Sequence, residues 1–97
     1  MRNITVRRTP SLNGFAVLFE VLFDDETISP LANGGEIVLE ADENEHSLRV
    51  RNPVLGNETQ TLTVPAGAED RRYVCEIRAK TQGWIGRTAS FVLEETE

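Results

Sequence analysis

The side chains of this chain that could take part in chemistry are mainly carboxylates, and they are unevenly placed. Half of the sixteen Asp and Glu residues, eight in all, lie on three short segments between apolar stretches. They are Asp24, Asp25, Glu26, Asp42, Glu43, Glu45, Glu69 and Asp70. Clustered carboxylates offer the oxygen ligands that calcium requires, but none of these segments has the Asp-x-Asp-x-Asp-Gly spacing of a calcium loop. The pattern therefore favours a solvated acidic surface and predicts no metal ligand, with calcium binding as an alternative.

The residue types used in nucleophilic and metal-dependent catalysis are too sparse to form a site. His46 is the only histidine and Cys75 the only cysteine, whereas a zinc site needs several such ligands. A catalytic triad needs an activated serine, and neither Ser11 nor Ser47 lies in a Gly-x-Ser-x-Gly segment. We predict that His46 is a partly exposed residue at the start of a strand and that Cys75 is a buried apolar residue. The protein is therefore expected not to be an enzyme and to have no cofactor.

The only tryptophan lies in a glycine-containing segment, residues 81–87, directly before Ile85. Tryptophan is a favoured anchor at protein interfaces, so an exposed loop with Trp84 and Ile85 would suit partner binding. Two other interpretations remain open from the sequence. In the first interpretation, Trp84 folds back over the end of the core. In the second interpretation, Trp84 belongs to a further strand.

The elements that position these residues are indicated by short segments with alternating apolar and polar residues, separated by turn residues. The predicted strands are Ile4–Arg7, Phe15–Phe23, Thr27–Ser29, Glu36–Glu40, His46–Arg51, Thr59–Val64, Tyr73–Ala79 and Ala89–Leu93. No window has apolar residues at helical spacing with a cap. We predict an all-β, antiparallel two-sheet sandwich of seven to eight strands, immunoglobulin-like or prealbumin-like, over residues 1–93. Residues 94–97 are expected to be a frayed acidic tail.

Successive loops of such a sandwich alternate between its two ends, because consecutive strands reverse direction. An acidic end is expected to collect the loops at 24–26, 41–45 and 65–70, and an apolar end those at 9–14, 32–35, 52–57 and 81–86. This division requires the short segment after Glu26 to count as a strand.

The apolar end is the predicted partner-binding site. Its loops carry five large apolar residues: Leu12, Val54, Leu55, Trp84 and Ile85. With no active site in the sequence, we predict a non-enzymatic binding or protein-interaction module, with an unknown protein partner or self-association through this end or through an unpaired edge strand. A carbohydrate-binding module is an alternative, because Trp84 and Tyr73 could stack on sugar rings.

Three segments resemble small bacterial β-sandwich domains of the PEGA-like or prealbumin-like type. They are Val21-Leu22-Phe23-Asp24-Asp25, Leu31-Ala32-Asn33-Gly34-Gly35 and Glu45-His46-Ser47-Leu48-Arg49-Val50. The resemblance covers residues 15–51 and implies an interaction or accessory module rather than an enzyme. Asp25 and Glu45 stand where these domains usually have glycine, so the two turn types differ from the family pattern. The resemblance assigns no functional residue.

Charge and hydropathy exclude other classes of partner. A net charge of −6 argues against nucleic acid. The densest basic pairs, Arg7-Arg8 and Arg71-Arg72, are predicted to be strand ends that face solvent. The longest apolar run, Phe15–Phe19, has five residues, which predicts no membrane span. The single cysteine and an N-terminus that enters a strand pattern directly favour a cytoplasmic location.

Overall fold

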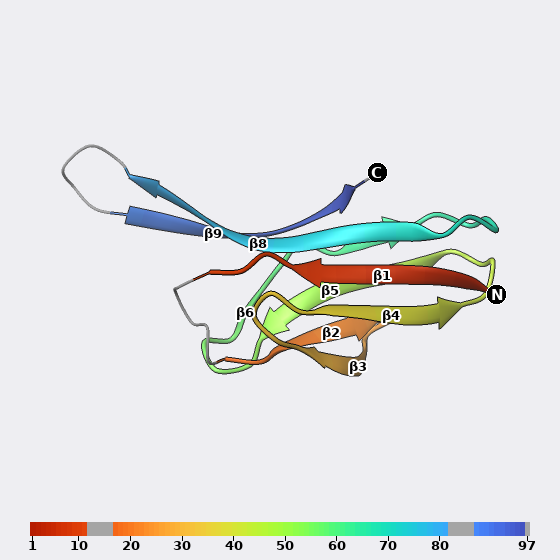
Figure 1. The fold of residues 1–97 in the computed structure, drawn as a ribbon, viewed down its shortest axis with the longest axis horizontal. Coiled ribbons are helices and arrows are strands. Elements are labelled where there is room, and N and C mark those ends of the chain that lie inside the picture. The colour runs from red at the N-terminus through yellow and green to blue at the C-terminus, as the bar shows by residue number, and fades with distance from the viewer. Residues whose placement is uncertain (12–16, 82–86, 97) are drawn as a thin grey trace.

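The computed structural model describes residues 1–11, 17–81 and 87–96, with only the backbone for residues 78–81 and 87–90. All regular structure in these ranges is β-strand, arranged in two sheets (Figure 1). The four-stranded sheet has the order β4 (Glu36–Ala41), β1 (Arg2–Arg8), β8 (Arg71–Thr81) and β9 (Arg87–Thr96). The five-stranded sheet has the order β3 (Glu26–Leu31), β2 (Phe19–Phe23), β5 (His46–Asn52) and β6 (Asn57–Glu58), with β7 (Leu62–Val64) also paired to β5. The predicted all-β, two-sheet organisation is therefore confirmed.

The prediction that all strands pair antiparallel is wrong at one place. β1 and β8 run parallel, with Ile4 opposite Arg71 and Arg8 opposite Cys75. Alternation along the chain predicts the direction of strands that follow one another. It says nothing about two strands that meet only after the chain has passed through the other sheet.

One core lies between the sheets and takes residues from both of them. Its buried members are Ile4, Val6, Phe19, Val21, Leu31, Leu39, Ala41, Leu48, Val50, Val64, Tyr73, Cys75 and Leu93. The rings of Phe19 and Phe91, one from each sheet, have their centroids 4.9 Å apart. The predicted burial of Cys75 is confirmed. Tyr73 on the same strand is buried with it, because alternate residues of a strand share one face, and so is Leu93, the partner of Cys75 on β9.

Several predicted strand limits need correction. β2 begins at Phe19 rather than at residue 15, and Leu18 is 55% exposed just before it. Of the segment predicted as a strand from Thr59 to Val64, only Leu62–Val64 is a strand, β7, and the short strand β6 lies before it. Between the two strands, the Thr59 hydroxyl accepts a hydrogen bond from the Val50 N–H at 3.0 Å in place of a backbone carbonyl. Residues 94–96, which were expected to fray, continue β9 and pair with β8.

Two arginines lie inside the molecule, and one of them overturns a prediction. Arg8 was expected to face solvent but is 2% exposed, and Arg2 is 1% exposed. One nitrogen of Arg8 donates to the carbonyl oxygens of Val17 at 2.7 Å and Leu31 at 2.9 Å. Its guanidinium also lies 3.5 Å from the centroid of the Phe19 ring. Burial lowers the pKa of Arg8, and these contacts stabilise the cation inside the fold.

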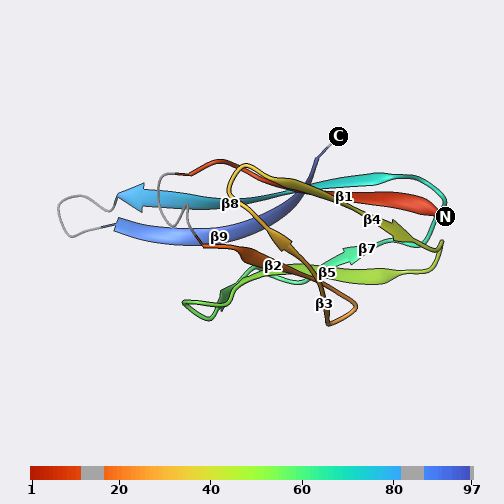
Figure 2. The same cartoon turned by 60° about the horizontal axis from the view of Figure 1, so that its bottom comes forward.

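The hairpin of β8 and β9 extends beyond the rest of the molecule (Figures 1 and 2). β1 follows β8 only as far as Cys75, where the Thr9 N–H donates to the Cys75 carbonyl. β8 and β9 continue to pair with each other up to Thr81 and Arg87. This projection contributes to the elongated shape, 49 × 24 × 21 Å.

The described residues contain no helix that is long and apolar enough to cross a membrane.

Candidate functional site

The predicted acidic end forms among the described residues, whereas most of loop 81–86 and part of loop 9–14 of the predicted apolar end lie outside them. At the acidic end, the Asn3 N–H donates to Asp70 Oδ1 at 2.8 Å, and the Gly67 N–H donates to the Glu43 carbonyl at 2.9 Å. At the opposite end, the Ser11 N–H donates to Asn33 Oδ1 at 2.9 Å, and Arg8 reaches Leu31. The short segment after Glu26 is the strand β3, as the division of the loops requires.

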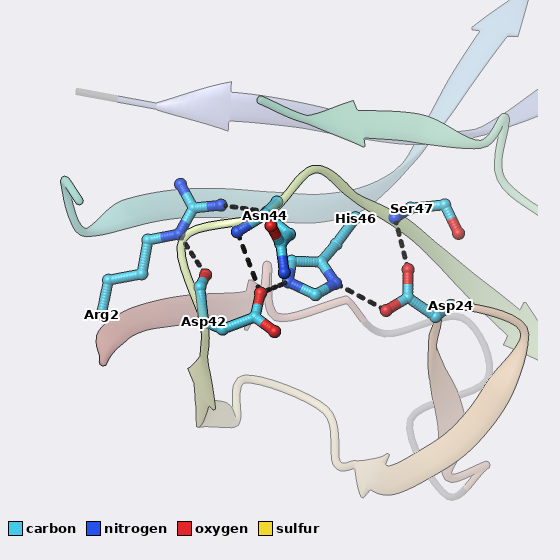
Figure 3. Close-up of polar contacts among 6 residues, drawn as sticks. All are labelled: Arg2, Asp24, Asp42, Asn44, His46 and Ser47. Carbon is cyan, nitrogen blue, oxygen red and sulfur yellow. Dashed lines mark hydrogen bonds and ion pairs between the residues drawn. The ribbon is translucent and has the colours of Figure 1, made fainter. Parts of the chain in front are cut away.

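His46 is the centre of the acidic end (Figure 3). Its Nδ1 lies 2.6 Å from Asp24 Oδ2, and its Nε2 lies 2.6 Å from Asp42 Oδ1. One face of the ring lies against Phe23, with centroids 4.7 Å apart. The predicted place of His46 at a strand start is confirmed. The sorting of the loops predicted that the segments of Asp24 and Asp42 lie at the same end, but it did not identify these two residues as the partners of His46. They come from two different loops.

Each carboxylate also accepts a hydrogen bond from a backbone N–H group, Asp24 from β5 and Asp42 from its own loop. Asp24 and Asp25 have positive φ values of 52° and 65°, the backbone that a two-residue hairpin turn requires. Asp24 Oδ1 accepts from the Ser47 N–H at 2.9 Å, and Asp42 Oδ1 accepts from the Asn44 N–H at 2.9 Å. The acids are therefore positioned before they meet the imidazole.

Arg2 joins this cluster to the four-stranded sheet. Its Nε donates to the Asp42 carbonyl at 3.1 Å, and its Nη2 donates to the Asn44 carbonyl at 2.9 Å (Figure 3). The buried guanidinium thus holds the loop between β4 and β5 in place, while the carboxylate of the same Asp42 reaches His46. Both sheets are tied together at this end by side-chain hydrogen bonds.

The charges of the cluster support one another. The hydrogen bond to Asp24 raises the pKa of His46, and the bond to Asp42 adds to this against the opposing effect of burial. The Asn44 N–H and His46 lower the pKa of Asp42. Burial alone would raise the pKa of Asp24, but the Ser47 N–H and His46 outweigh it and keep that pKa below its usual range. These directions favour an imidazolium that donates to two carboxylates.

This arrangement uses both imidazole nitrogens, so neither faces a free space where a substrate proton or a metal ion could sit. Among the described residues, no group of three or more His, Cys, Asp or Glu is placed to hold a metal ion. Two acids of this end, Asp24 and Asp42, form a structural clamp around one cation, which is the side chain of His46.

The apolar end has a different construction, built on Asn52. This residue is 6% exposed, and its Oδ1 accepts from the N–H groups of Val54 at 3.0 Å and Leu55 at 3.3 Å. The Gly56 N–H donates to the Asn52 carbonyl at 2.9 Å, and Gly56 supplies a positive φ of 76°. The turn is closed by its own backbone, and the side chains of Val54 and Leu55 are left 71% and 70% exposed.

Leu18 precedes β2 and is a further exposed apolar residue. β2 and β5 pair Glu20 with Arg51, which also form an ion pair of 3.0 Å. Continued by two residues, this register places Leu18 opposite Pro53, just before Val54. The exposed apolar surface at this end therefore extends from the turn towards β2.

The other three predicted partner-binding residues, Leu12, Trp84 and Ile85, lie outside the described residues.

Comparisons of the chain with protein-family models, with curated proteins and with solved structures found no match.

Proposed function

We propose that this domain is a non-enzymatic protein-interaction module that binds a protein partner through its apolar end. The observation that carries the proposal is the Asn52 turn, which holds Val54 and Leu55 outward with about seven-tenths of each side chain exposed. Large apolar side chains fixed in solvent on a hydrogen-bonded turn are a feature of binding surfaces. Their positions are set before binding, so little ordering entropy is lost on association.

The size of this surface limits the affinity that it can give. Burying two such side chains contributes roughly 1.5–3 kcal/mol each. Association itself costs at least about 4 kcal/mol, so two residues alone give weak binding. Leu18, 55% exposed, adds to the surface. The sequence predicts further contributions from Leu12, Trp84 and Ile85, and these remain part of the proposal.

Enzymatic and carbohydrate-binding functions are less well supported. His46 is engaged at both nitrogens, and burial raises the pKa of the Cys75 thiol to about 12, so neither offers a reactive group at neutral pH. Tyr73 is 2% exposed, so a sugar-stacking surface would depend on Trp84 alone. We also propose that the sandwich is immunoglobulin-like or prealbumin-like, that the domain is similar to PEGA-like modules, and that its location is cytoplasmic. The binding experiment described next tests the partner-binding surface alone.

The test replaces both exposed side chains and compares the variant with a matched one on another surface. Peptides are selected from a displayed random library on the wild-type domain, and their binding is then measured by calorimetry on each variant. V54S/L55S is expected to weaken binding at least about tenfold, because buried apolar contact is lost. The control is V38S, on β4, where Val38 is 57% exposed. Equal affinity for wild type and V54S/L55S would falsify the proposal.

A further inference from the structure

The projecting hairpin has strand edges with no neighbouring strand among the described residues. β9 is at the edge of the four-stranded sheet, with no described strand on its far side. Beyond Cys75, β8 also has no described strand on its β1 side, so residues 77–81 and 87–91 form a two-stranded ribbon. Two-stranded ribbons are marginally stable alone in water, and an open edge is a template for another strand.

The side chain of Gln60 shows which backbone groups of β9 face this open edge. Its Nε2 donates to the Leu93 carbonyl at 2.8 Å, and its Oε1 lies 3.5 Å from the Leu93 N–H. An amide side chain therefore occupies the place of a strand peptide at Leu93. In an antiparallel strand, the N–H and C=O groups of successive residues point alternately to one side of the strand and to the other. The N–H and C=O groups of Arg87, Ala89 and Phe91 therefore point to the open edge, as those of Leu93 do.

We propose that β9 pairs antiparallel with β9 of a second copy of this chain, about a two-fold axis at Ala89. The open stretch from Arg87 to Phe91 is symmetric about that residue, and Gln60 bounds it at Leu93. The pairing sets Ala89 opposite Ala89 and Arg87 opposite Phe91 of the second copy. In this pairing, all N–H and C=O groups of the stretch that point to the open edge form hydrogen bonds with the second copy. The contacts of Gln60 with Leu93 are retained. The two four-stranded sheets become one continuous sheet.

The residue types fit this register. The residues between these hydrogen-bonded pairs are Thr88 and Ser90. Thr88 of each copy lies opposite Ser90 of the other copy, so the two-fold axis gives two such pairs. Thr–Ser pairs are favourable across strands, and no like charges face each other. The ribbon extends past the body of its own chain, so a second copy can approach this edge from the side (Figure 1).

Three other edges, those of β8, β4 and β3, carry features that oppose the same contact. On the open edge of β8, a two-fold axis at Ala79 would set Arg78 opposite Lys80 twice, which is destabilising. β4 has Glu36 and Glu40 on its exposed face, and β3 contains Pro30. β9 is neutral from Thr88 to Leu93, which favours a second copy of itself as the occupant.

The variant T88E/S90E separates association from folding. Within one chain, the backbone register sets residue 88 opposite Lys80 and residue 90 opposite Arg78, so each glutamate is introduced opposite a basic residue type. Between copies, the same change sets glutamates opposite each other twice. Sedimentation velocity on the full chain is expected to show a concentration-dependent dimer of 10.8 kDa subunits for wild type. T88E/S90E raises its dissociation constant at least about tenfold.

The matched control is T88Q/S90Q, which introduces side chains of the same length without charge and is expected to retain the dimer. V54S/L55S is also expected to keep it, since that surface is separate. The inference is wrong if wild type is monomeric from about 1 μM to about 1 mM, or if T88E/S90E dimerises like wild type. It is also wrong if V54S/L55S abolishes the dimer, and this result would leave the apolar end as the contact.

Cross-linking tests the axis itself. A89C brings two thiols to directly opposed positions, within the range that a disulfide can span. S90C places the two thiols on diagonal positions about 7–8 Å apart, beyond that range. Cys75 is buried with a raised pKa, so the introduced thiol is the reactive one. Mild oxidation is expected to link A89C and not S90C; equal cross-linking of the two contradicts the proposed register.

Discussion

At the scale of single residues, His46 joins two loops that are distant in the sequence through a pair of 2.6 Å contacts. The clamp is strongest when the imidazole is protonated and both aspartates are ionised. Its contribution to stability is therefore largest in a pH window that the three pKa shifts define, below the pKa of His46 and above those of Asp24 and Asp42.

The first prediction concerns the alkaline side of this window. The pKa of His46 is raised above its unfolded value of about 6.5, so the stabilisation is complete below that pH and is lost as pH rises through the folded-state pKa. The free energy of unfolding in urea is expected to fall between pH 5.5 and pH 9. In H46Q, which cannot titrate, this fall is expected to disappear. An unchanged slope in H46Q would show that other groups cause it.

The second prediction concerns Arg8. R8A removes a cation that bonds two buried carbonyl oxygens and covers the Phe19 ring, and it leaves a cavity. We expect the free energy of unfolding to fall by about 3 kcal/mol. The exposed neighbour provides the control, because R7A is expected to change stability by less than about 0.5 kcal/mol. Equal effects in the two variants would contradict the assigned role of Arg8.

At the scale of elements, the hairpin of β2 and β3 turns on two residues that are not glycine. Asp24 serves the clamp through its side chain, but Asp25 is 79% exposed and makes only a 3.4 Å contact with Arg49. Its positive φ of 65° therefore costs conformational free energy that the contacts of its side chain offset only in small part.

The third prediction follows from this turn. D25G is expected to raise the free energy of unfolding by about 0.5–1 kcal/mol, because glycine adopts positive φ without strain. D25A removes the same carboxylate but keeps the Cβ, so it is expected to give no gain. Thermal and urea unfolding of the pair give the comparison, and a gain in both variants would assign the effect to charge instead.

The turn between β5 and β6 supports a fourth prediction. N52A removes the acceptor for two N–H groups inside a nearly buried site and is expected to cost about 1–2 kcal/mol of stability. It is also expected to weaken binding of the selected peptides, although Val54 and Leu55 are unchanged. N52D keeps the acceptor and should retain most of the affinity. Full binding by folded N52A would show that the turn does not position the apolar pair.

At the scale of the whole molecule, stability is expected to be concentrated in the body and low in the projecting ribbon. Val74 and Lys80 both pair with β9, opposite Glu94 and Thr88, but only Val74 also has β1 on its other side. In dilute solution, hydrogen exchange at Lys80 is expected to be at least about tenfold faster than at Val74. The difference is expected to shrink when the chain associates, and equal rates at both residues in dilute solution contradict a separate ribbon.

Local pattern determined a large part of this fold. Alternation with a period of two placed Tyr73, Cys75 and Leu93 inward, and the turn residues between strands sorted the loops into an acidic and an apolar end. The exposed positions of Val54 and Leu55 also followed, since they lie in a loop between two predicted strands. These features depend on neighbours in the chain, which a sequence displays directly.

Tertiary structure alone decided the rest. The parallel pairing of β1 with β8 joins segments distant in sequence. The burial of Arg2 and Arg8 and the contact of His46 with Asp24 also depend on distant segments. From the sequence alone, a charged residue at a strand end is predicted to be exposed, because the carbonyl groups and rings that enclose it belong to other segments. The physical reason is that alternation specifies which face a side chain occupies, whereas its partners depend on how separate strands are brought together in space.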